Sequence, residues 1–229
     1  MRVVAFLLTF IFCLFGVGTA DATHYPSSRI ERYATNTPRV VENNLNNLTR
    51  HLIKPLDDDY DKAKMIAFWI ASHINYDEYL YNGEGTTKLM KNHHIQSPRD
   101  LLASRVGICS EFANLFEEMC RIAGIRAGKI SGFAYPSVYK LHHKEKKLYS
   151  HAWNYFLYNN KKIYVDTTFM AKGRTTPEHR VTNLSHRRAL RNVKNDNKNK
   201  SQINDFEKYY FDFDYKDEIK KRRYKHEER

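Results

Sequence analysis

One stretch of the sequence, residues 105–124 (RVGICSEFANLFEEMCRIAG), constrains the fold more than any other. Apolar side chains recur in it at spacings of three and four, which predicts an amphipathic helix with one face toward a core. Gly107 and Gly124 suit the turns before and after that helix. The apolar face consists of Phe112, Leu115, Phe116, Met119, Ile122 and Ala123. The opposite, polar face consists of Glu111, Asn114, Glu117, Glu118 and Arg121.

Cys109 is therefore expected at the N-terminus of the helix. Unpaired N–H groups and the positive end of the helix dipole stabilise a thiolate there, and the thiolate is the nucleophilic form of cysteine. A lone cysteine is more often a small buried core residue, so the helix alone leaves both interpretations open. The choice depends on whether the chain supplies a base for the thiol.

Two segments rich in aromatic and β-branched residues, 150–158 (SHAWNYFLY) and 161–168 (KKIYVDTT), follow later in the chain. They are separated by Asn159-Asn160, which predicts a β-hairpin with a two-residue turn. In that register, the numbers of facing residues sum to 319.

This register makes a specific prediction about His151. Trp153 would face Asp166, and His151 would lie on the same face as Trp153 because it is two residues away in the strand. His151 and Asp166 are then diagonal neighbours, about 7–8 Å apart at their backbones. Together with Cys109, they supply the thiol, histidine and carboxylate of a cysteine-nucleophile triad.

The sequences GICSEFANLF, AGIRAGKISGFAY, HAWN and VDTT resemble, in form and order, motifs of the transglutaminase-like superfamily. The resemblance covers about residues 58–168. It implies that Cys109 is the nucleophile, His151 the general base and acid, and Asp166 the partner that orients His151. The later segment DFEKYYFDFDYKDEI is similar to one in the kyphoscoliosis-peptidase-like branch of that superfamily.

The order of elements predicts an α+β fold with a papain-like, transglutaminase-like core, in which the nucleophile helix packs on an antiparallel β-sheet. We expect this core at 57–170, after an N-terminal helical lead-in at 23–56. A single helix is predicted over 29–53, and the first strand of the sheet over 129–135. A loop near the mouth of the active site is predicted over 78–96.

Two further helices are predicted from their first residues. Asp57, Asp58 and Asp59 suit the N-terminus of a helix that continues through KAKMIAFWIASHINYD. Ser97 and Pro98 are typical of the cap and first position of a short helix that leads toward Gly107.

An enzyme with this nucleophile needs an oxyanion hole. The backbone N–H of Cys109 would supply one donor. For the second donor the candidates are Trp69, Tyr76 and Gln96, among which the sequence does not choose.

The N-terminal residues 1–22 carry one positive charge and then an apolar run from Val3 to Val17. A run of this length is typical of a signal peptide, and cleavage near Asp21 or Thr23 is expected. The alternative is an uncleaved anchor. Either way we expect an exported protein, periplasmic, extracellular or held to a membrane by this segment, with no other transmembrane segment.

Without the signal, Cys109 and Cys120 are the remaining cysteines. Eleven residues of helix separate them by about 16 Å, which is too far for a disulfide. Cys120 is expected in the core.

Residues 171–229 form a basic, partly mobile C-terminal extension in this interpretation. Residues 172–229 contain 17 basic and 10 acidic residues, and so contribute +7 of the chain's +12 charge. An anionic cell-envelope surface is the expected partner if the charge binds anything, and solvation is the simpler alternative. No nucleic acid is expected, because the sequence holds no motif for binding it.

No cofactor or metal is expected. The pairs His93-His94 and His142-His143 lack acidic or cysteine partners, and the aspartates at 57–59 suit helix capping better than calcium binding.

The sequence leaves two main hypotheses for function. The first is a cysteine-dependent enzyme that acts on protein or peptide amide bonds through a thioester, as a peptidase, a deamidase or a transglutaminase-type acyltransferase. The second is a catalytically silent binding or scaffold module with the same fold. A peptide N-glycanase-like amidase is disfavoured because the paired cysteines of its zinc site are missing.

Overall fold

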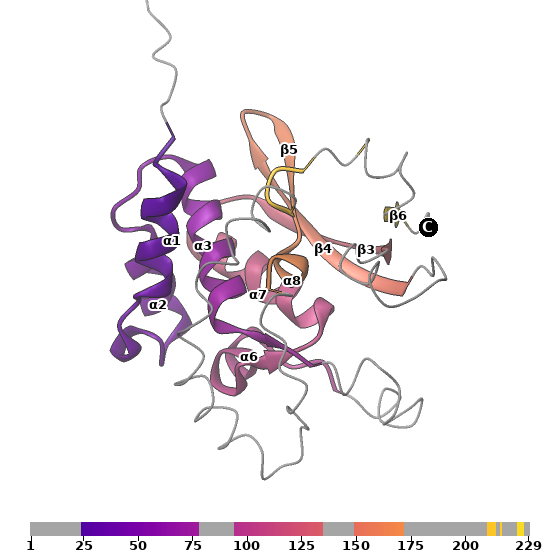
Figure 1. The fold of residues 1–229 in the computed structure, drawn as a ribbon, viewed down its shortest axis with the longest axis horizontal. Helices are drawn as coiled ribbons and strands as arrows, with labels where there is room; N and C mark the ends of the chain where they lie inside the picture. Colours follow the sequence, from indigo (N-terminus) through magenta and orange to yellow (C-terminus); the bar gives the residue numbers. More distant parts are fainter. Residues whose placement is uncertain are drawn as a thin grey trace, which may run out of the picture.

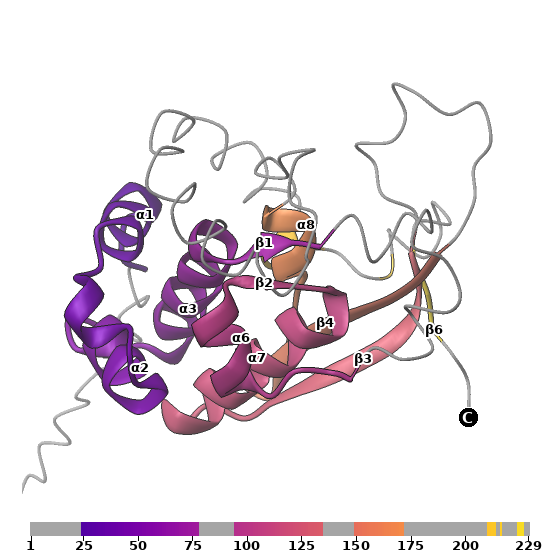
Figure 2. The ribbon, with the colours of Figure 1, turned by 90° about the horizontal axis from the view of Figure 1, so that it is seen from below.

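The structure, a computed structural model, describes residues 24–77, 94–134, 149–171, 210–213, 216 and 224–226. The predicted signal segment, residues 78–93 of the loop predicted over 78–96, the His142-His143 pair and most of the basic C-terminal stretch lie outside the described residues. Figures 1 and 2 show helices on one side of the molecule and an antiparallel sheet on the other.

The sheet has four strands in the order β5-β4-β3-β6, and every neighbouring pair is antiparallel. A second, two-stranded parallel sheet joins β1 to β2 and so brings Tyr76 beside Gly107. The strands are β1 (Asn75–Tyr76), β2 (Val106–Gly107), β3 (Ala127–Ala134), β4 (Tyr149–Tyr158), β5 (Lys161–Val165) and β6 (Tyr224–His226). The α+β class predicted from the sequence is confirmed.

The predicted hairpin register is also confirmed. Tyr158 faces Lys161 and the numbers of facing residues sum to 319 along the whole of β5. Asn159 and Asn160 have φ angles of 48° and 60°, the left-handed conformation that a two-residue hairpin turn needs and that asparagine tolerates.

The predicted second strand was too long. β5 ends at Val165, and Thr167–Ala171 forms a short helix, α8. The helix begins here because Asp166 Oδ1 accepts a hydrogen bond from the backbone N–H of Phe169 at 2.9 Å, which is the geometry of a helix cap.

The N-terminal region also differs from its prediction, since residues 29–53 are not one helix. α1 (Ser27–Thr35) ends before Pro38, and α2 (Leu45–Ile53) starts after a 3₁₀ turn at Arg39–Val41. Proline lacks the N–H that a continuous helix would need at this point.

α3 (Asp59–His73) is the central helix. Its N-terminus is capped as predicted, by Asp58 Oδ1, which accepts from the N–H groups of Tyr60 and Asp61. Most of its residues from Ala63 to Ser72 are buried, because α1 and α2 cover one side while α7 and α8 cover the other. Such burial on all sides indicates a core helix rather than a surface helix that buries one face.

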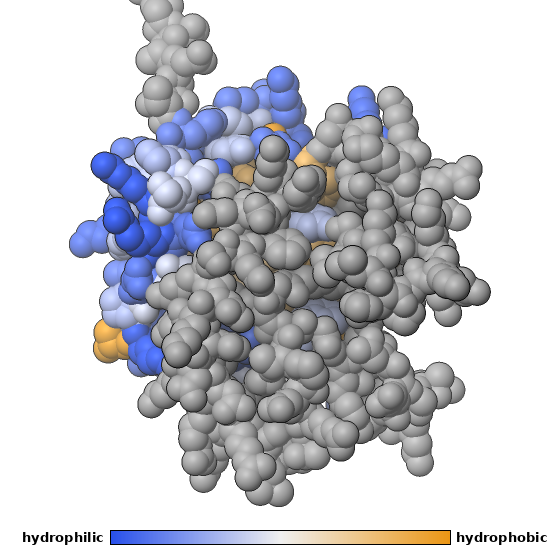
Figure 3. Space-filling model, viewed as in Figure 1, coloured by the Kyte–Doolittle hydropathy of each residue, from blue (hydrophilic) through white to orange (hydrophobic). Residues whose placement is uncertain are grey.

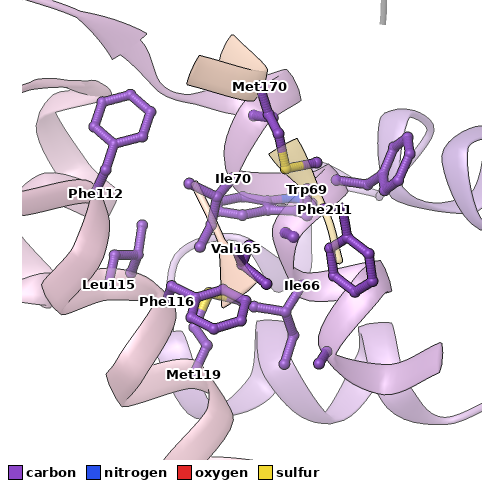
Figure 4. Close-up of a cluster of buried hydrophobic side chains, with 14 of the residues drawn as sticks. Ile66, Trp69, Ile70, Phe112, Leu115, Phe116, Met119, Val165, Met170 and Phe211 are labelled. Atoms are coloured by element: carbon purple, nitrogen blue, oxygen red, sulfur yellow. The ribbon is translucent and has the colours of Figure 1, made fainter. Parts of the chain in front are cut away.

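The nucleophile helix is α7 (Cys109–Ile122), preceded by α6 (Pro98–Ser104), whose Ser97 cap was predicted. Figure 4 shows its apolar face turned toward α3 and the sheet. The labelled side chains of this core are Ile66, Trp69, Ile70, Phe112, Leu115, Phe116, Met119, Val165, Met170 and Phe211. Cys120 lies in the same core, as predicted.

On the face shown in Figure 3, the described residues over α1 and α2 are mostly hydrophilic. None of the helices in the described part of the chain is both long and apolar enough to cross a membrane.

Candidate active site

Cys109 is the first residue of α7 and is half-buried. Asn154, a fully buried residue of β4, holds this helix against the sheet through its side-chain amide. The amide donates to the carbonyl of Ala113 in α7 at 3.1 Å and to that of Gly128 in β3 at 3.3 Å. This link fixes the N-terminus of α7 relative to the strand that carries His151.

His151 and Asp166 are in direct contact, with His151 Nε2 2.7 Å from Asp166 Oδ2. Both side chains are buried, His151 to 7% exposure and Asp166 completely. The other carboxylate oxygen of Asp166 is engaged by Phe169 N–H. The backbone N–H of Asp166 donates to the carbonyl of Tyr210 at 2.9 Å. The carboxylate is therefore held with one oxygen directed at the imidazole.

The ring of His151 is fixed from the side as well. Phe169 stacks on it, with ring centroids 4.3 Å apart and planes 12° from parallel. Such stacking leaves the imidazole little freedom to rotate away from Asp166.

The thiol of Cys109 lies close enough to His151 that each side chain shifts the pKa of the other. Because Nε2 contacts Asp166, the ring nitrogen available to the thiol is Nδ1. The structure thus brings together the three side chains that the sequence singled out, with the imidazole between the thiol and the carboxylate.

The surroundings change the pKa values of the thiol and of the imidazole. Burial alone would raise the pKa of Cys109, but its hydrogen bond to His151 and the charge of that residue lower the pKa overall. Burial likewise disfavours the protonated form of His151. The charge and hydrogen bond of Asp166, helped by Cys109, nevertheless raise its pKa to about 9. These shifts favour a thiolate–imidazolium pair near neutral pH.

Glu111 lies in an environment that differs from its prediction. It was assigned to the polar face of α7, yet its side chain is fully buried. Its carboxylate accepts hydrogen bonds from the backbone N–H of Ile108 at 2.8 Å and of Gln96 at 2.8 Å. Glu111 is the third residue of α7, the position from which a glutamate reaches back to the residue before the helix. That spacing was the signal available in the sequence.

The close packing beside Glu111 requires Gly107. A β-carbon at this position would lie 2.5 Å from Glu111 Oε2 and 2.6 Å from Leu101 Cδ1. The glycine therefore permits the approach of Glu111 that fixes the segment just before Cys109.

Two of the three oxyanion candidates donate elsewhere. The indole N–H of Trp69 contacts Glu42 Oε1 at 3.3 Å, and Gln96 Nε2 donates to the carbonyl of Val106 at 2.9 Å and to Glu111 at 3.2 Å. Tyr76 is 6% exposed and has its ring 6.3 Å from that of Phe112.

Sequence periodicity did not indicate the role of Tyr210. Besides accepting from Asp166 N–H, this residue places its ring edge-on against Phe169 at 5.2 Å. A segment 44 residues away in the chain thus supports the carboxylate and the ring that stacks on His151.

Within the described residues, the one group of three side chains arranged to hold a metal ion is His24, Asp58 and Asp61. It is remote from the thiol, because Asp58 contacts Tyr158, seven residues along β4 from His151.

Fold and site together define a papain-like arrangement, with a thiol at a helix N-terminus facing a histidine and a carboxylate on the sheet. The chain belongs to the transglutaminase-like superfamily, whose family model matches residues 46–167.

Two curated relatives agree with this assignment. Kyphoscoliosis peptidase of Mus musculus is 29% identical over 129 residues, which are 56% of this chain and 18% of that protein. The Homo sapiens protein of the same name is 26% identical over 141 residues, 62% of this chain and 20% of that protein. The chain therefore spans about a fifth of the length of these relatives.

Solved structures are more distant. A crystal structure of a TGase is 14% identical, with a TM-score of 0.44, and the match covers 71% of this chain and 37% of that one. A likeness this remote gives no information about activity.

Proposed function

We propose that the protein is a cysteine-dependent enzyme that acts on protein or peptide amide bonds through a thioester. The observation that carries the proposal is the arrangement of His151, which is hydrogen-bonded to buried Asp166 and lies beside the Cys109 thiol. A structural cysteine does not need an imidazole whose pKa is raised or a carboxylate held in place to raise it.

In the first step, the Cys109 thiolate attacks the carbonyl carbon of the amide. The carbonyl oxygen becomes an oxyanion, which the Cys109 backbone N–H stabilises because the first N–H groups of a helix have no acceptor within it. His151 donates its proton to the leaving nitrogen as the C–N bond breaks. The products of this step are a free amine and a thioester on Cys109.

In the second step, His151 takes a proton from the acceptor as the acceptor attacks the thioester. The C–S bond breaks, and Cys109 leaves as the thiolate beside protonated His151. Water as acceptor gives hydrolysis, and a primary amine gives acyl transfer. Asp166 orients the imidazole throughout and stabilises its protonated form.

The names of the two curated relatives favour peptidase activity among these outcomes. The chain spans about a fifth of their length, so their substrates are not assigned to it, and the reaction is tested on this chain.

One experiment tests the proposal and separates the outcomes. A library of glutamine-containing peptides is incubated with the full chain, with and without a labelled primary amine, and analysed by mass spectrometry. Chain cleavage, conversion of glutamine to glutamate, and amine incorporation mark the peptidase, the deamidase and the acyltransferase respectively.

Cys109→Ala and His151→Ala are the matched variants, and circular dichroism checks that both are folded. We expect either one to reduce turnover to near background, by about 10⁴-fold or more. Undiminished turnover in folded Cys109→Ala would overturn the proposal, and a parent chain that fails to modify any peptide would favour the silent binding module.

We further propose that residues 1–22 direct export and that the basic C-terminal stretch contacts an anionic envelope surface. The apolar run from Val3 to Val17 and the +7 charge of residues 172–229 support these two proposals. Recovery of intact Met1 in a soluble cytoplasmic fraction of the native host would contradict export.

A further inference from the structure

A second cluster of chemically active side chains lies at the other end of β4 from His151. His24 Nδ1 is 3.7 Å from Asp58 Oδ1 and 3.6 Å from Asp61 Oδ1. The three atoms lie within 4.8 Å of one another. They converge on one point from the start of the described chain and from the first turn of α3.

Each carboxylate in the cluster accepts a hydrogen bond at its Oδ2 atom. Asp61 Oδ2 accepts the backbone N–H of Tyr25 at 2.6 Å, and Asp58 Oδ2 accepts the hydroxyl of Tyr158 at 2.9 Å. These bonds fix both groups so that the Oδ1 atoms face His24. The ring of His24 in turn lies against Tyr60, with centroids 4.3 Å apart.

Asp61 provides an independent indication of a ligand. This residue is 4% exposed, and its Oδ1 is a buried atom without a hydrogen-bond partner. A carboxylate oxygen removed from water and left without a donor is costly, so such atoms normally meet a donor or a cation. The nearest basic atom that faces it is His24 Nδ1, at a distance too long for a hydrogen bond.

We propose that His24, Asp58 and Asp61 bind a zinc-type divalent cation. Zinc bonds of about 2.0–2.2 Å in a tetrahedron separate neighbouring ligand atoms by about 3.3–3.6 Å. His24 Nδ1 is 3.6 Å from Asp61 Oδ1, at the upper end of this spacing, and 3.7 Å from Asp58 Oδ1, just above it. The third edge of the site, between the two carboxylates, is at most 4.8 Å long.

The ligand set favours zinc over calcium. Calcium takes six to eight oxygen ligands, whereas this cluster offers one nitrogen and two oxygens. His24 is 43% exposed, so the fourth position of a tetrahedron faces solvent and can hold a water. The positive end of the α3 dipole opposes a cation, but Asp58 already neutralises the N–H groups of Tyr60 and Asp61 there.

A metal ion at this point would tie the segment at His24 to the start of α3 and, through Asp58 and Tyr158, to the end of β4. The site would therefore be structural, and independent of the amide chemistry proposed for Cys109.

Zinc titration of the full chain by isothermal calorimetry tests the proposal. The Cys109→Ala background is used throughout, because a reactive thiolate also binds zinc. We expect one saturable zinc per chain, and an affinity at least about tenfold lower in His24→Ala and in Asp61→Asn. Asparagine keeps an oxygen for Tyr25 N–H, and His24 is exposed, so both variants should fold.

Matched controls keep the ligand types but lie outside the cluster. Asp59→Asn removes a carboxylate that pairs with Lys62, and His94→Ala removes an exposed histidine; both should bind zinc as the background does. The absence of a saturable zinc site, an affinity unchanged in folded His24→Ala, or saturable binding of calcium but not zinc would each overturn the proposal.

Discussion

Cys109 and Cys120 lie on the same helix, and their surroundings give the same side chain opposite properties. Cys109 is half-buried at the first position of α7, where His151 lowers the pKa of its thiol. Cys120 is completely buried two residues before the end of α7, and burial raises the pKa of its thiol well above the usual value. The charges of Glu117 and Asp59 raise it further.

The difference shows what makes a cysteine nucleophilic in this fold. Both residues belong to the helix with the strongest sequence pattern, so the helix itself does not distinguish them. The two ends of the dipole act in opposite directions, and of the two thiols the one that interacts with His151 lies at the N-terminal end. The proposed chemistry therefore depends on how α7 is docked on the sheet, and the following predictions test that dependence.

The largest expected effect is on alkylation. Iodoacetamide at mildly acidic pH should label Cys109 at least about 10³-fold faster than Cys120 in the folded chain. Cys120 reacts only after the core opens, which costs several kcal/mol, and each 1.4 kcal/mol is a factor of ten. Peptide mapping by mass spectrometry measures both rates in one sample. Equal rates at the two thiols would show that their surroundings do not differ as described.

Loss of the Asp166 carboxylate should reduce turnover less than loss of the Cys109 thiol, because Asp166 orients His151 and does not itself react. Asp166→Asn keeps the shape but loses the charge that stabilises imidazolium, so turnover should fall by roughly 10- to 10⁴-fold. We expect the lower part of this range, because a thiolate stabilised by the helix dipole depends less on the carboxylate. The loss is measured by comparing kcat/KM of Asp166→Asn with that of the parent chain on a substrate found in the peptide library. A loss as large as that of Cys109→Ala would mean that Asp166 does more than orient.

Local rules predicted α7 and the hairpin because their determinants lie close together in sequence. A repeat of three and four residues specifies a helix face, and a two-residue asparagine turn specifies which residues of β4 and β5 oppose each other. The contact of His151 with Asp166 follows from that register. The end of β5 at Val165 was not predicted, because the cap at Asp166 competes with the strand for the same residues.

The remaining features depend on contacts between distant parts of the chain. Glu111 looked polar and exposed in the helix pattern, yet Gln96 satisfies its carboxylate in the interior. Tyr210 supports Asp166 from a segment that lies beyond the predicted core. Periodicity describes one element at a time, so it cannot indicate which element supplies the partner of a buried polar group.

The pH dependence of alkylation sharpens the comparison without a known substrate. Cys109 should already be labelled as a thiolate at pH values below 9.0, the ordinary pKa of a cysteine thiol, because protonated His151 stabilises the thiolate. As pH rises through about 9, His151 loses its proton and the rate should change in a second step. In Asp166→Asn this step should move to lower pH, because Asp166 is what raises the pKa of His151 against burial. If the alkylation rate of the parent chain rose in a single step near pH 9.0, that result would contradict the thiolate–imidazolium pair.

The smallest effect is expected from Cys120→Ala, which tests the other half of the comparison. The sulfur of Cys120 fills space between α7 and its neighbours in the core, so its loss removes about as much buried volume as one methyl group. The free energy of unfolding should fall by about 1 kcal/mol. For a chain of this size that is a decrease of about 2–4 °C in Tm, measured by calorimetry.

The same variant should leave the labelling rate of Cys109 within about twofold of the parent. Cys120 lies eleven residues, or about 16 Å of helix, away from Cys109, and effects at such separations add independently. Reduced labelling of Cys109 in folded Cys120→Ala would show that packing near the C-terminus of α7 controls the position of its N-terminus on the sheet. In that case, helix docking would be less rigid than the contacts of Asn154 with Ala113 and Gly128 imply.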